Sequence, residues 1–311
     1  MANTYGKVSG TFEEIENAYG KVSGAWKEAD EIYGKVSGVW KLVFAAFTPS
    51  SVQILSSGSG TFTVPDGANA IHIQASVGGG GGAAGGVSYD KAGGESAGAG
   101  GGSGAYVSDK VFSVTAGETI TYAIGGGGAP GNQTANFGQP KTGSAGTNTT
   151  LSGSAAGSLF SLVGGGGASG TNGGVQGPLR TNTAGTAGAA TVNGTAITSG
   201  TFRDSDGTTK NITSLTAGPV GTFNQSGNGA VGGNNGNCSG DNCQIAGSNG
   251  ADSYAGNIDG GNGVGIGGPA ATVGTRGSGG GGGGAQNVGS TGETAFAGGA
   301  GEVQYRFLRV N

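Results

Sequence analysis

Glycine blocks that follow short apolar runs are the feature that most constrains how this chain can fold. Residues 75–82, 122–128 and 159–167 each pass from an apolar strand pattern into consecutive glycines. A fourth block at 279–284 comes shortly before a closing strand pattern at 302–310. A flexible linker would not need these apolar lead-ins. We therefore interpret the glycines as structural material that strands hold in place. One glycine of each block, Gly80, Gly126, Gly165 and Gly281, is expected to lie inside close-packed backbone, where a Cβ would clash.

The glycine content leaves two interpretations open. The chain has 77 glycines in 311 residues, and ordering glycine costs more backbone entropy than ordering any other residue. A flexible low-complexity chain is one interpretation. The net charge of only -4 and the Asn, Thr, Ser and Ala between the glycines favour the other, polyglycine II helices, whose amides must bond to neighbouring segments.

The first 47 residues differ from the rest. The segment Tyr-Gly-Lys-Val-Ser-Gly at 5–10 recurs at 19–24 and 33–38, every 14 residues. Apolar residues spaced alternately three and four apart would fit a coiled-coil seam, but the glycines and Ser disfavour a helix. We favour strands, with Ser-Gly as a two-residue hairpin turn. Such a small module can bury little surface, which predicts attachment or oligomerisation. The candidate residues are Tyr19, Trp26, Tyr33 and Trp40.

The remainder, residues 48–311, predicts one glycine-rich β domain. Alternating strand patterns occur within about 48–125, at 61–65, 70–77, 105–107, 111–114 and 119–124, and again at 302–310. The interval of about 126–301 is expected to hold glycine-rich loops and helices. The fold class that we predict is mainly β. We expect a β-sandwich-like scaffold with polyglycine II helices and glycine-rich loops, preceded by short N-terminal β-hairpin repeats.

The chain offers little for catalysis, and we predict that it is not an enzyme. His72 is the sole histidine, and the alternation around it predicts an ordinary surface position. No metal site or cofactor is expected. The segment 204–207 begins like a calcium loop, but Leu215 stands where the closing Glu is needed, so a hairpin turn fits better. The dinucleotide-like pattern at 263–268 is expected by chance in so glycine-rich a chain.

The two cysteines leave an alternative open. Cys238 and Cys243 could close a small loop by a disulfide, which would suit an extracellular protein. Two free thiols made in a reducing cytosol are the other interpretation. The N-terminus carries no apolar run that resembles a signal peptide. We expect synthesis in the host cytoplasm and export as part of an assembly. Nucleic acid is not an expected partner, because Lys and Arg do not cluster.

A family resemblance rests on the spaced strand motifs. Residues 62–67, the run 71–77 into glycines, and 115–120 before the second glycine block resemble the glycine-rich domain of bacteriophage tail fibre and receptor-binding proteins. The N-terminal repeats look like those of phage tail proteins. The chain after Gly125 is similar to T-even-like tip adhesins, in which polyglycine helices carry variable loops that touch the host.

The resemblance implies a virion structural protein of the tail fibre or tail tip type, on an exterior part of the particle. Its partners would be other virion proteins, bound through the N-terminal repeats, and a bacterial surface glycan or outer-membrane protein; a homo-trimer is one possible state. Bulky residues in the glycine-rich loops are the receptor-contact candidates: Tyr89, Asp90, Lys91, Phe137, Leu179, Arg180, Phe223 and Tyr254.

Three other functions compete with receptor binding. A purely architectural virion protein, such as a fibre, baseplate or capsid decoration protein, would make no receptor contact. A polysaccharide-degrading tailspike would need a pair of carboxylates, which can lie far apart in the chain. An ice-binding or matrix protein would need flat, regular faces, which the irregular segment lengths disfavour.

Overall fold

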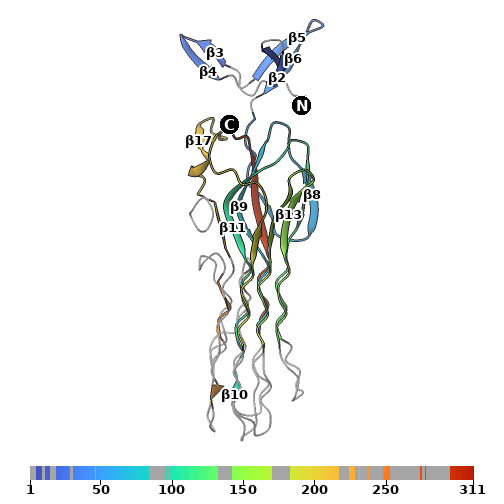
Figure 1. The fold of residues 1–311 in the computed structure, drawn as a ribbon, viewed down its shortest axis with the longest axis vertical. Coiled ribbons are helices and arrows are strands. Elements are labelled where there is room, and N and C mark those ends of the chain that lie inside the picture. Colours follow the sequence, from blue (N-terminus) through green and yellow to red (C-terminus); the bar gives the residue numbers. More distant parts are fainter. Residues whose placement is uncertain are drawn as a thin grey trace.

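The computed structural model shows an elongated molecule with N-terminal hairpins at one end, a β scaffold in the middle and glycine-rich segments running away from the scaffold (Figure 1). It describes residues 5–8, 11–14, 19–28, 31–45, 47–83, 95–96, 98–131, 142–169, 183–216, 224–227, 231, 237–238, 248–252, 274, 277 and 295–311. Among these residues, no helix is long and apolar enough to span a membrane.

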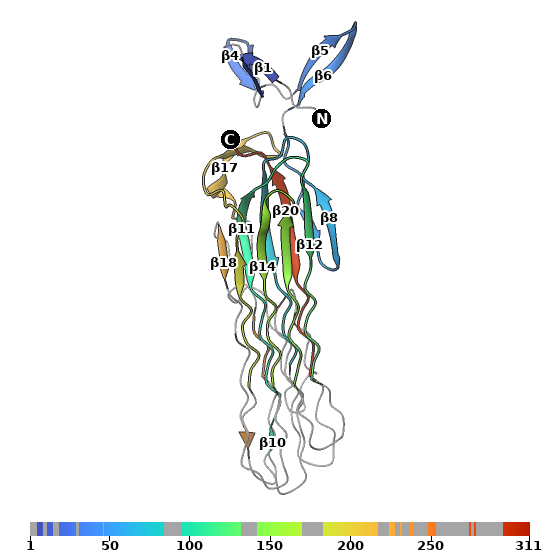
Figure 2. The same ribbon diagram turned by 45° about the vertical axis from the view of Figure 1, so that its right-hand side comes forward.

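Two antiparallel sheets form the scaffold (Figure 2). The first sheet has the order β18 (Gln225–Gly227), β11 (Tyr106–Ser113), β9 (Ala70–Val77), β20 (Glu302–Leu308) and β7 (Gln53–Leu55). The second sheet has the order β15 (Ala190–Val192), β14 (Gly157–Leu162), β13 (Thr149–Gly153), β12 (Thr119–Ala123) and β8 (Ser59–Thr63). The chain crosses between the sheets from β8 to β9 and from β11 to β12.

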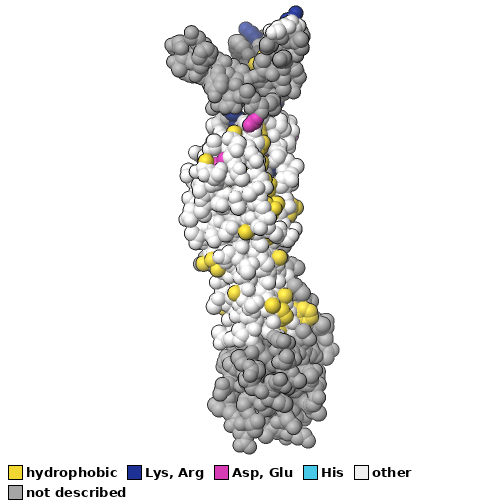
Figure 3. All heavy atoms as spheres, turned by 90° about the vertical axis from the view of Figure 1, so that its right-hand side faces the viewer, with side chains coloured by type: hydrophobic (Ala, Val, Ile, Leu, Met, Phe, Trp, Pro, Cys, Tyr) yellow, Lys and Arg dark blue, Asp and Glu magenta, His cyan; other side chains and the backbone are white. Residues whose placement is uncertain are grey.

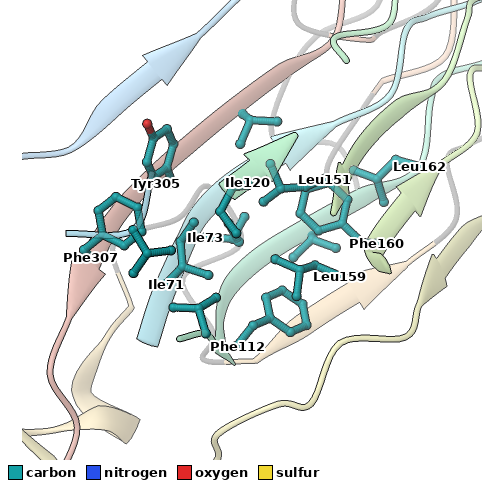
Figure 4. Packing of buried hydrophobic residues seen from close by; sticks show 14 of the residues in the cluster. Ile71, Ile73, Phe112, Ile120, Leu151, Leu159, Phe160, Leu162, Tyr305 and Phe307 are labelled. Atoms are coloured by element: carbon teal, nitrogen blue, oxygen red, sulfur yellow. The ribbon is translucent and has the colours of Figure 1, made fainter. Parts of the chain in front are cut away.

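The hydrophobic core lies between the two sheets, where alternate residues of both point inward (Figure 4). Phe112 and Phe160 meet there with ring centroids 6.3 Å apart. Phe62 from the second sheet stacks on Tyr305 from the first, with centroids 4.5 Å apart. These aromatic contacts join the sheets, and the sequence alternation in each strand follows from having one buried face.

The outer face of the second sheet carries hydroxyl groups. Thr61 pairs with Thr121 and Thr63 with Thr119, and all four are exposed. The side of the scaffold that carries β8 accordingly shows few charged side chains (Figure 3). These four exposed side chains are neutral and present hydroxyl groups to the solvent.

The outer face of the first sheet is covered by residues 195–216, which we call the strap. The strap contains β16 (Thr201–Arg203), β17 (Thr209–Asn211) and the short 3-10 helix η1 (Ile212–Ser214). It begins along β11, where the Ile197 amide donates to the Val111 carbonyl, and it pairs with the C-terminal residues through Thr201 and Asn311. A second apolar cluster lies beneath it: Ala70, Val111, Phe202, Ile212, Leu215 and Leu308.

The N-terminal repeats form separate two-stranded hairpins, which confirms the strand prediction. They comprise β1 (Tyr5–Val8) with β2 (Thr11–Glu14), β3 (Tyr19–Val22) with β4 (Ala25–Glu28), and β5 (Glu31–Val36) with β6 (Val39–Ala45). In the second and third hairpins the Ser and Gly of the turn both have positive φ, at 51° and 84–86°. Two consecutive positive φ values are typical of the I′ turn, which explains the recurring Ser-Gly.

The predicted fold class is confirmed: the described chain is mainly β, with a sandwich-like pair of antiparallel sheets. The sequence patterns at 105–107 and 111–114 belong to a single strand, β11. The second sheet also takes β13, β14 and β15 from the interval that we assigned mainly to glycine-rich loops and helices. A further pair, β10 (Glu95–Ser96) and β19 (Asn237–Cys238), lies away from both sheets among the glycine-rich segments (Figure 1).

Candidate functional site: the glycine bundle and its end

Glycine-rich segments continue from the strand ends and pack side by side. We call these segments the glycine bundle; the described ones are 78–83, 98–105, 125–131, 142–148, 163–169, 183–189, 248–251 and 295–301. Most of them extend a strand directly: 78–83 follows β9, 125–131 follows β12, and 163–169 follows β14. The apolar lead-ins in the sequence are therefore the strands that anchor the bundle to the scaffold.

The amides of residues 78–83 all donate to other segments of the bundle. In order along the chain, their acceptors are the carbonyls of Ala105, Thr147, Gly299, Gly102, Ser144 and Phe296, at 2.7–3.2 Å. The same three neighbouring segments thus recur in the same order after three residues. A three-residue period without bonds inside the segment is the geometry of polyglycine II.

The carbonyls of the same segment accept bonds from two more neighbours. Gly79 and Gly82 accept from segment 163–169, and Gly80 and Ala83 accept from segment 125–131. Segment 78–83 is therefore surrounded by hydrogen-bonded partners. Because each buried amide and carbonyl costs free energy when it is left unpaired, this pairing replaces a hydrophobic core as the source of order.

Hydroxyl groups complete the pairing where the bundle meets the sheets. The buried Thr149 hydroxyl accepts from the Gly125 amide at 3.0 Å and donates to the Val77 carbonyl at 2.9 Å. The Gly126 amide donates to the Thr147 hydroxyl at 2.7 Å. The Ser and Thr residues between the glycines therefore serve as hydrogen-bonding partners of the backbone.

Close backbone packing explains why glycine is needed at many of these positions. A Cβ on Gly81 would meet the Gly166 carbonyl, and one on Gly165 would meet the Gly102 carbonyl, well inside any normal contact distance. The prediction that Gly165 lies in close-packed backbone is therefore confirmed. Gly80 is buried and donates to Gly299 at 2.8 Å. Gly281 lies outside the described residues.

The same prediction is wrong for Gly126. A Cβ there would have only the Thr147 hydroxyl as a neighbour, at an ordinary 3.8 Å, and Gly126 is exposed. In a helix with three residues per turn, successive residues face different sides. Gly126 is on the side that faces outward. A glycine block in the sequence does not indicate which of its members face a neighbour.

The receptor-contact candidates lie outside the described residues. They are Tyr89, Asp90, Lys91, Phe137, Leu179, Arg180, Phe223 and Tyr254. Tyr89 to Lys91 fall between the described segments 78–83 and 98–105, Phe137 falls between 125–131 and 142–148, and Leu179 and Arg180 fall between 163–169 and 183–189. For Phe223, the following residue Asn224 donates its amide to the Asp109 carbonyl on the scaffold. These assignments stay predictions.

The attachment candidates occupy matching register positions in the hairpins. Trp26 pairs with Lys21 and Trp40 with Lys35, at the same place relative to each turn. Tyr19 pairs with Glu28, and Tyr33 pairs with Leu42. Their contacts with a partner stay predictions.

Other sequence candidates have mixed outcomes. Cys238 lies on β19, paired with Glu95, while Cys243 lies outside the described residues, so the disulfide stays a prediction. The segment at 204–207 forms the turn between β16 and β17, with Gly207 at φ 78°, which confirms the hairpin interpretation. The dinucleotide-like pattern at 263–268 lies outside the described residues.

The expectation that His72 is an ordinary surface residue is wrong: its exposed fraction is 1%. It does point away from the main core, as the alternation predicts, but the strap covers that face. Its Nε2 lies 3.2 Å from Oδ1 of the fully buried Asp109, and Arg306 Nε donates to its Nδ1 at 3.4 Å. Sequence reasoning missed this group because its members are 37 and 234 residues from His72 in the chain.

The fold and the bundle together define a class of protein: a β scaffold that carries backbone-bonded glycine segments. Comparison with known families agrees, since residues 55–308 match the glycine-rich domain. The chain belongs to this glycine-rich domain family. No curated protein matches the sequence.

Proposed function

We propose that this protein is a virion structural protein of the bacteriophage tail fibre or tail tip type, which presents loops to a receptor on the bacterial surface. The observation that supports this most is the separation of two different ends. Repeated hairpins lie on one side of the scaffold, and the described glycine bundle extends from the opposite side (Figure 1). The bundle between them would hold the receptor-binding end at a fixed distance from the attachment end.

The hydrogen bonds of the bundle support the position of the contact loops. Ala83 bonds to Phe296 and to Gly131, and Ser169 exchanges bonds with Thr183. These residues stand at or next to the ends of their described segments, on the side away from the strands in the sequence. The intervals 84–94, 132–141 and 170–182 follow directly on these residues. In this proposal they carry Tyr89 to Lys91, Phe137, and Leu179 with Arg180 to the receptor. A rigid support lowers the entropy cost of binding.

The hairpins support the attachment role. In the described residues each hairpin pairs only with itself, and an isolated two-stranded hairpin is marginally stable in water. A partner surface would therefore stabilise it. Three copies of one sequence in one chain suit a partner with three equivalent sites, such as the end of a trimeric fibre. The partner in this proposal is another virion protein.

Four described carboxylates already bind neighbouring groups of this chain, which disfavours them as the catalytic pair of a tailspike. Asp204 and Asp206 both bind Lys210, Asp109 contacts His72, and Glu118 accepts from the amides of Ala155 and Ala156. Asp109 and Glu118 are buried within the scaffold, and Asp204 and Asp206 lie in the turn between β16 and β17. The architectural alternative differs from the proposal only in receptor contact, so a binding experiment separates the two.

The test uses particles that contain the full chain. Antibodies against the scaffold should label the outer ends of the tail fibres in electron micrographs. In a second step, Tyr89, Phe137 and Leu179 are replaced together by alanine, and adsorption to host cells is measured. We expect at least a tenfold lower adsorption rate with unchanged particle composition. Ile54→Ala, which removes an exposed apolar side chain from β7 of the scaffold, provides the comparison and should leave adsorption unchanged.

Two results would decide against the proposal. Labelling of the capsid alone would remove the tail assignment. Labelling of the fibre ends with normal adsorption by the triple variant, folded and incorporated, would leave the architectural function.

A further inference from the structure

The strap is held to the first sheet by a chain of polar contacts that begins at His72. Arg306 on β20 binds the ring with its Nε and contacts Asp204 Oδ1 of the strap with its NH1, at 3.2 Å. Asp204 Oδ2 in turn lies 2.6 Å from Lys210 Nζ on β17. The guanidinium also lies over the Phe202 ring, 5.7 Å from its centroid. Arg306 therefore connects the buried ring to the strap.

The contacts define the protonation state of His72. A guanidinium only donates hydrogen bonds, so Nδ1 must accept and carries no proton. The remaining proton is then on Nε2, which donates to the Asp109 carboxylate. His72 is thus a neutral ring between a carboxylate and a guanidinium, and a second proton would have to sit on Nδ1, facing Arg306.

We propose that this arrangement is an acid-operated latch, in which protonation of His72 releases the strap from the outer face of the first sheet. The imidazolium keeps its bond to Asp109 but repels Arg306, which loses its contact at Nδ1 and with it its position against Asp204. Release of the strap uncovers the apolar face formed by Ala70, Val111 and Leu308. This inference is independent of the proposed virion function.

The charged surroundings support His72 as the group that responds. Among the described residues, Asp109 of β11 and Arg306 of β20 face the ring, and Asp204 and Lys210 of the strap lie one contact further. Burial lowers the pKa of His72, as does Arg306, while Asp109 opposes the shift. Burial raises the pKa of Asp204, but Lys210, the Ser205 amide and Arg306 outweigh it, and the pKa is lowered. The hydrogen bonds from Thr208 lower the pKa of the exposed Asp206 to about 2. Both strap carboxylates therefore stay charged at mildly acidic pH.

The direction of the pH effect follows from linkage. Because the pKa of His72 is lower in the folded protein than its ordinary value of about 6.5, the folded state takes up the proton less readily than the open state. The stabilisation of the closed strap is complete above that value and is lost as the pH falls below it.

The experiment measures hydrogen exchange of the full chain at pH 7.5 and pH 5.0, with times corrected for the slower chemical exchange in acid. Strap peptides spanning 201–211 should exchange at least tenfold faster at pH 5.0, while peptides from β13 and β14 stay protected. The glutamine side chain of His72→Gln supplies a neutral acceptor and donor at every pH. Strap exchange in this variant should therefore change less than twofold between pH 7.5 and pH 5.0. Asp206→Asn, which alters a carboxylate that binds Lys210 only from the exposed side, should keep the acid response.

Equal strap protection at both pH values, or an acid response in His72→Gln as large as in the unmodified chain, overturns the proposal. If His72→Gln does not fold, the single histidine gives a direct readout in the unmodified chain by ¹⁵N and ¹³C NMR. The ring should carry its proton on Nε2 at pH 7.5, and its titration should coincide with the loss of strap protection. A titration at a different pH from the loss of protection also overturns the proposal.

Discussion

Single glycines of the bundle are not equivalent, and their differences follow from the side that each presents to its neighbours. Gly165 faces the carbonyl of Gly102, whereas Gly126 faces the hydroxyl of Thr147 at contact distance. Gly127 is exposed, yet a Cβ there would meet the Gly298 carbonyl. The exposure of a bundle glycine therefore does not predict whether it tolerates a larger side chain. The direction of the Cβ relative to the neighbouring backbone decides it.

Substitution of two bundle glycines by alanine should have effects of opposite sign. Gly165→Ala should lower the melting temperature by several degrees, since overpacking costs on the order of 1–3 kcal/mol. Gly126→Ala should leave it unchanged or raise it slightly, because alanine restricts the unfolded chain by about 0.4–1 kcal/mol. Scanning calorimetry of the two variants checks this, and equal melting temperatures would contradict close packing at Gly165.

Thr149 should be more sensitive to loss of its hydroxyl than to loss of its methyl group. Thr149→Val keeps the shape but leaves the Gly125 amide and the Val77 carbonyl without their partner, at a cost of about 1–3 kcal/mol. Thr149→Ser keeps the hydroxyl and is the matched control. Urea unfolding should rank the chains as unmodified, serine and then valine in falling stability; a valine variant as stable as the serine variant would refute this role.

Strands and hairpins were largely predictable from the sequence, because each depends on local alternation and turn chemistry. The patterns at 70–77, 119–124 and 302–310 correspond to β9, β12 and β20, and Ser-Gly marks the hairpin turns. The single strand β11 was not anticipated, because Ser108, Asp109 and Lys110 interrupt the apolar pattern. Asp109 is fully buried, with φ at 46°. No sequence pattern indicated that the strap covers the first sheet, since this arrangement depends on contacts between distant parts of the chain.

Phe47, the last residue before the predicted domain boundary, packs against the scaffold. Phe47 is partly buried against the main core, and its ring lies 3.4 Å from where a Cβ on Gly67 would be. We therefore expect Phe47 to contribute to the stability of the scaffold. A chain that begins at Phe47 should melt within about one degree of the full chain, while a chain that begins at Thr48 should melt several degrees lower. Equal melting of the two truncated chains would contradict the packing role of Phe47.

At the scale of the whole molecule, two kinds of order are combined. The scaffold is held by a hydrophobic core, and the bundle continues its strands mainly through backbone pairing, which Ser and Thr hydroxyls complete. The sequence indicated ordered glycine through the apolar lead-ins, and the three-residue period of the hydrogen bonds agrees. The sequence could not reveal which segments are neighbours, since that depends on how the strands are ordered in the two sheets. The receptor-contact residues likewise depend on parts of the chain outside the described residues.

Hydrogen exchange of the amides of residues 79–83 tests most directly whether the glycine bundle is an ordered, backbone-bonded structure. Each of these amides donates to a neighbouring segment, so their exchange should be as slow as that of β9, at least a thousandfold slower than in an unstructured chain. Measurement by NMR on the full chain at neutral pH resolves the individual glycines. Exchange of these amides at the rate of an unstructured chain, with β9 still protected, would contradict the account.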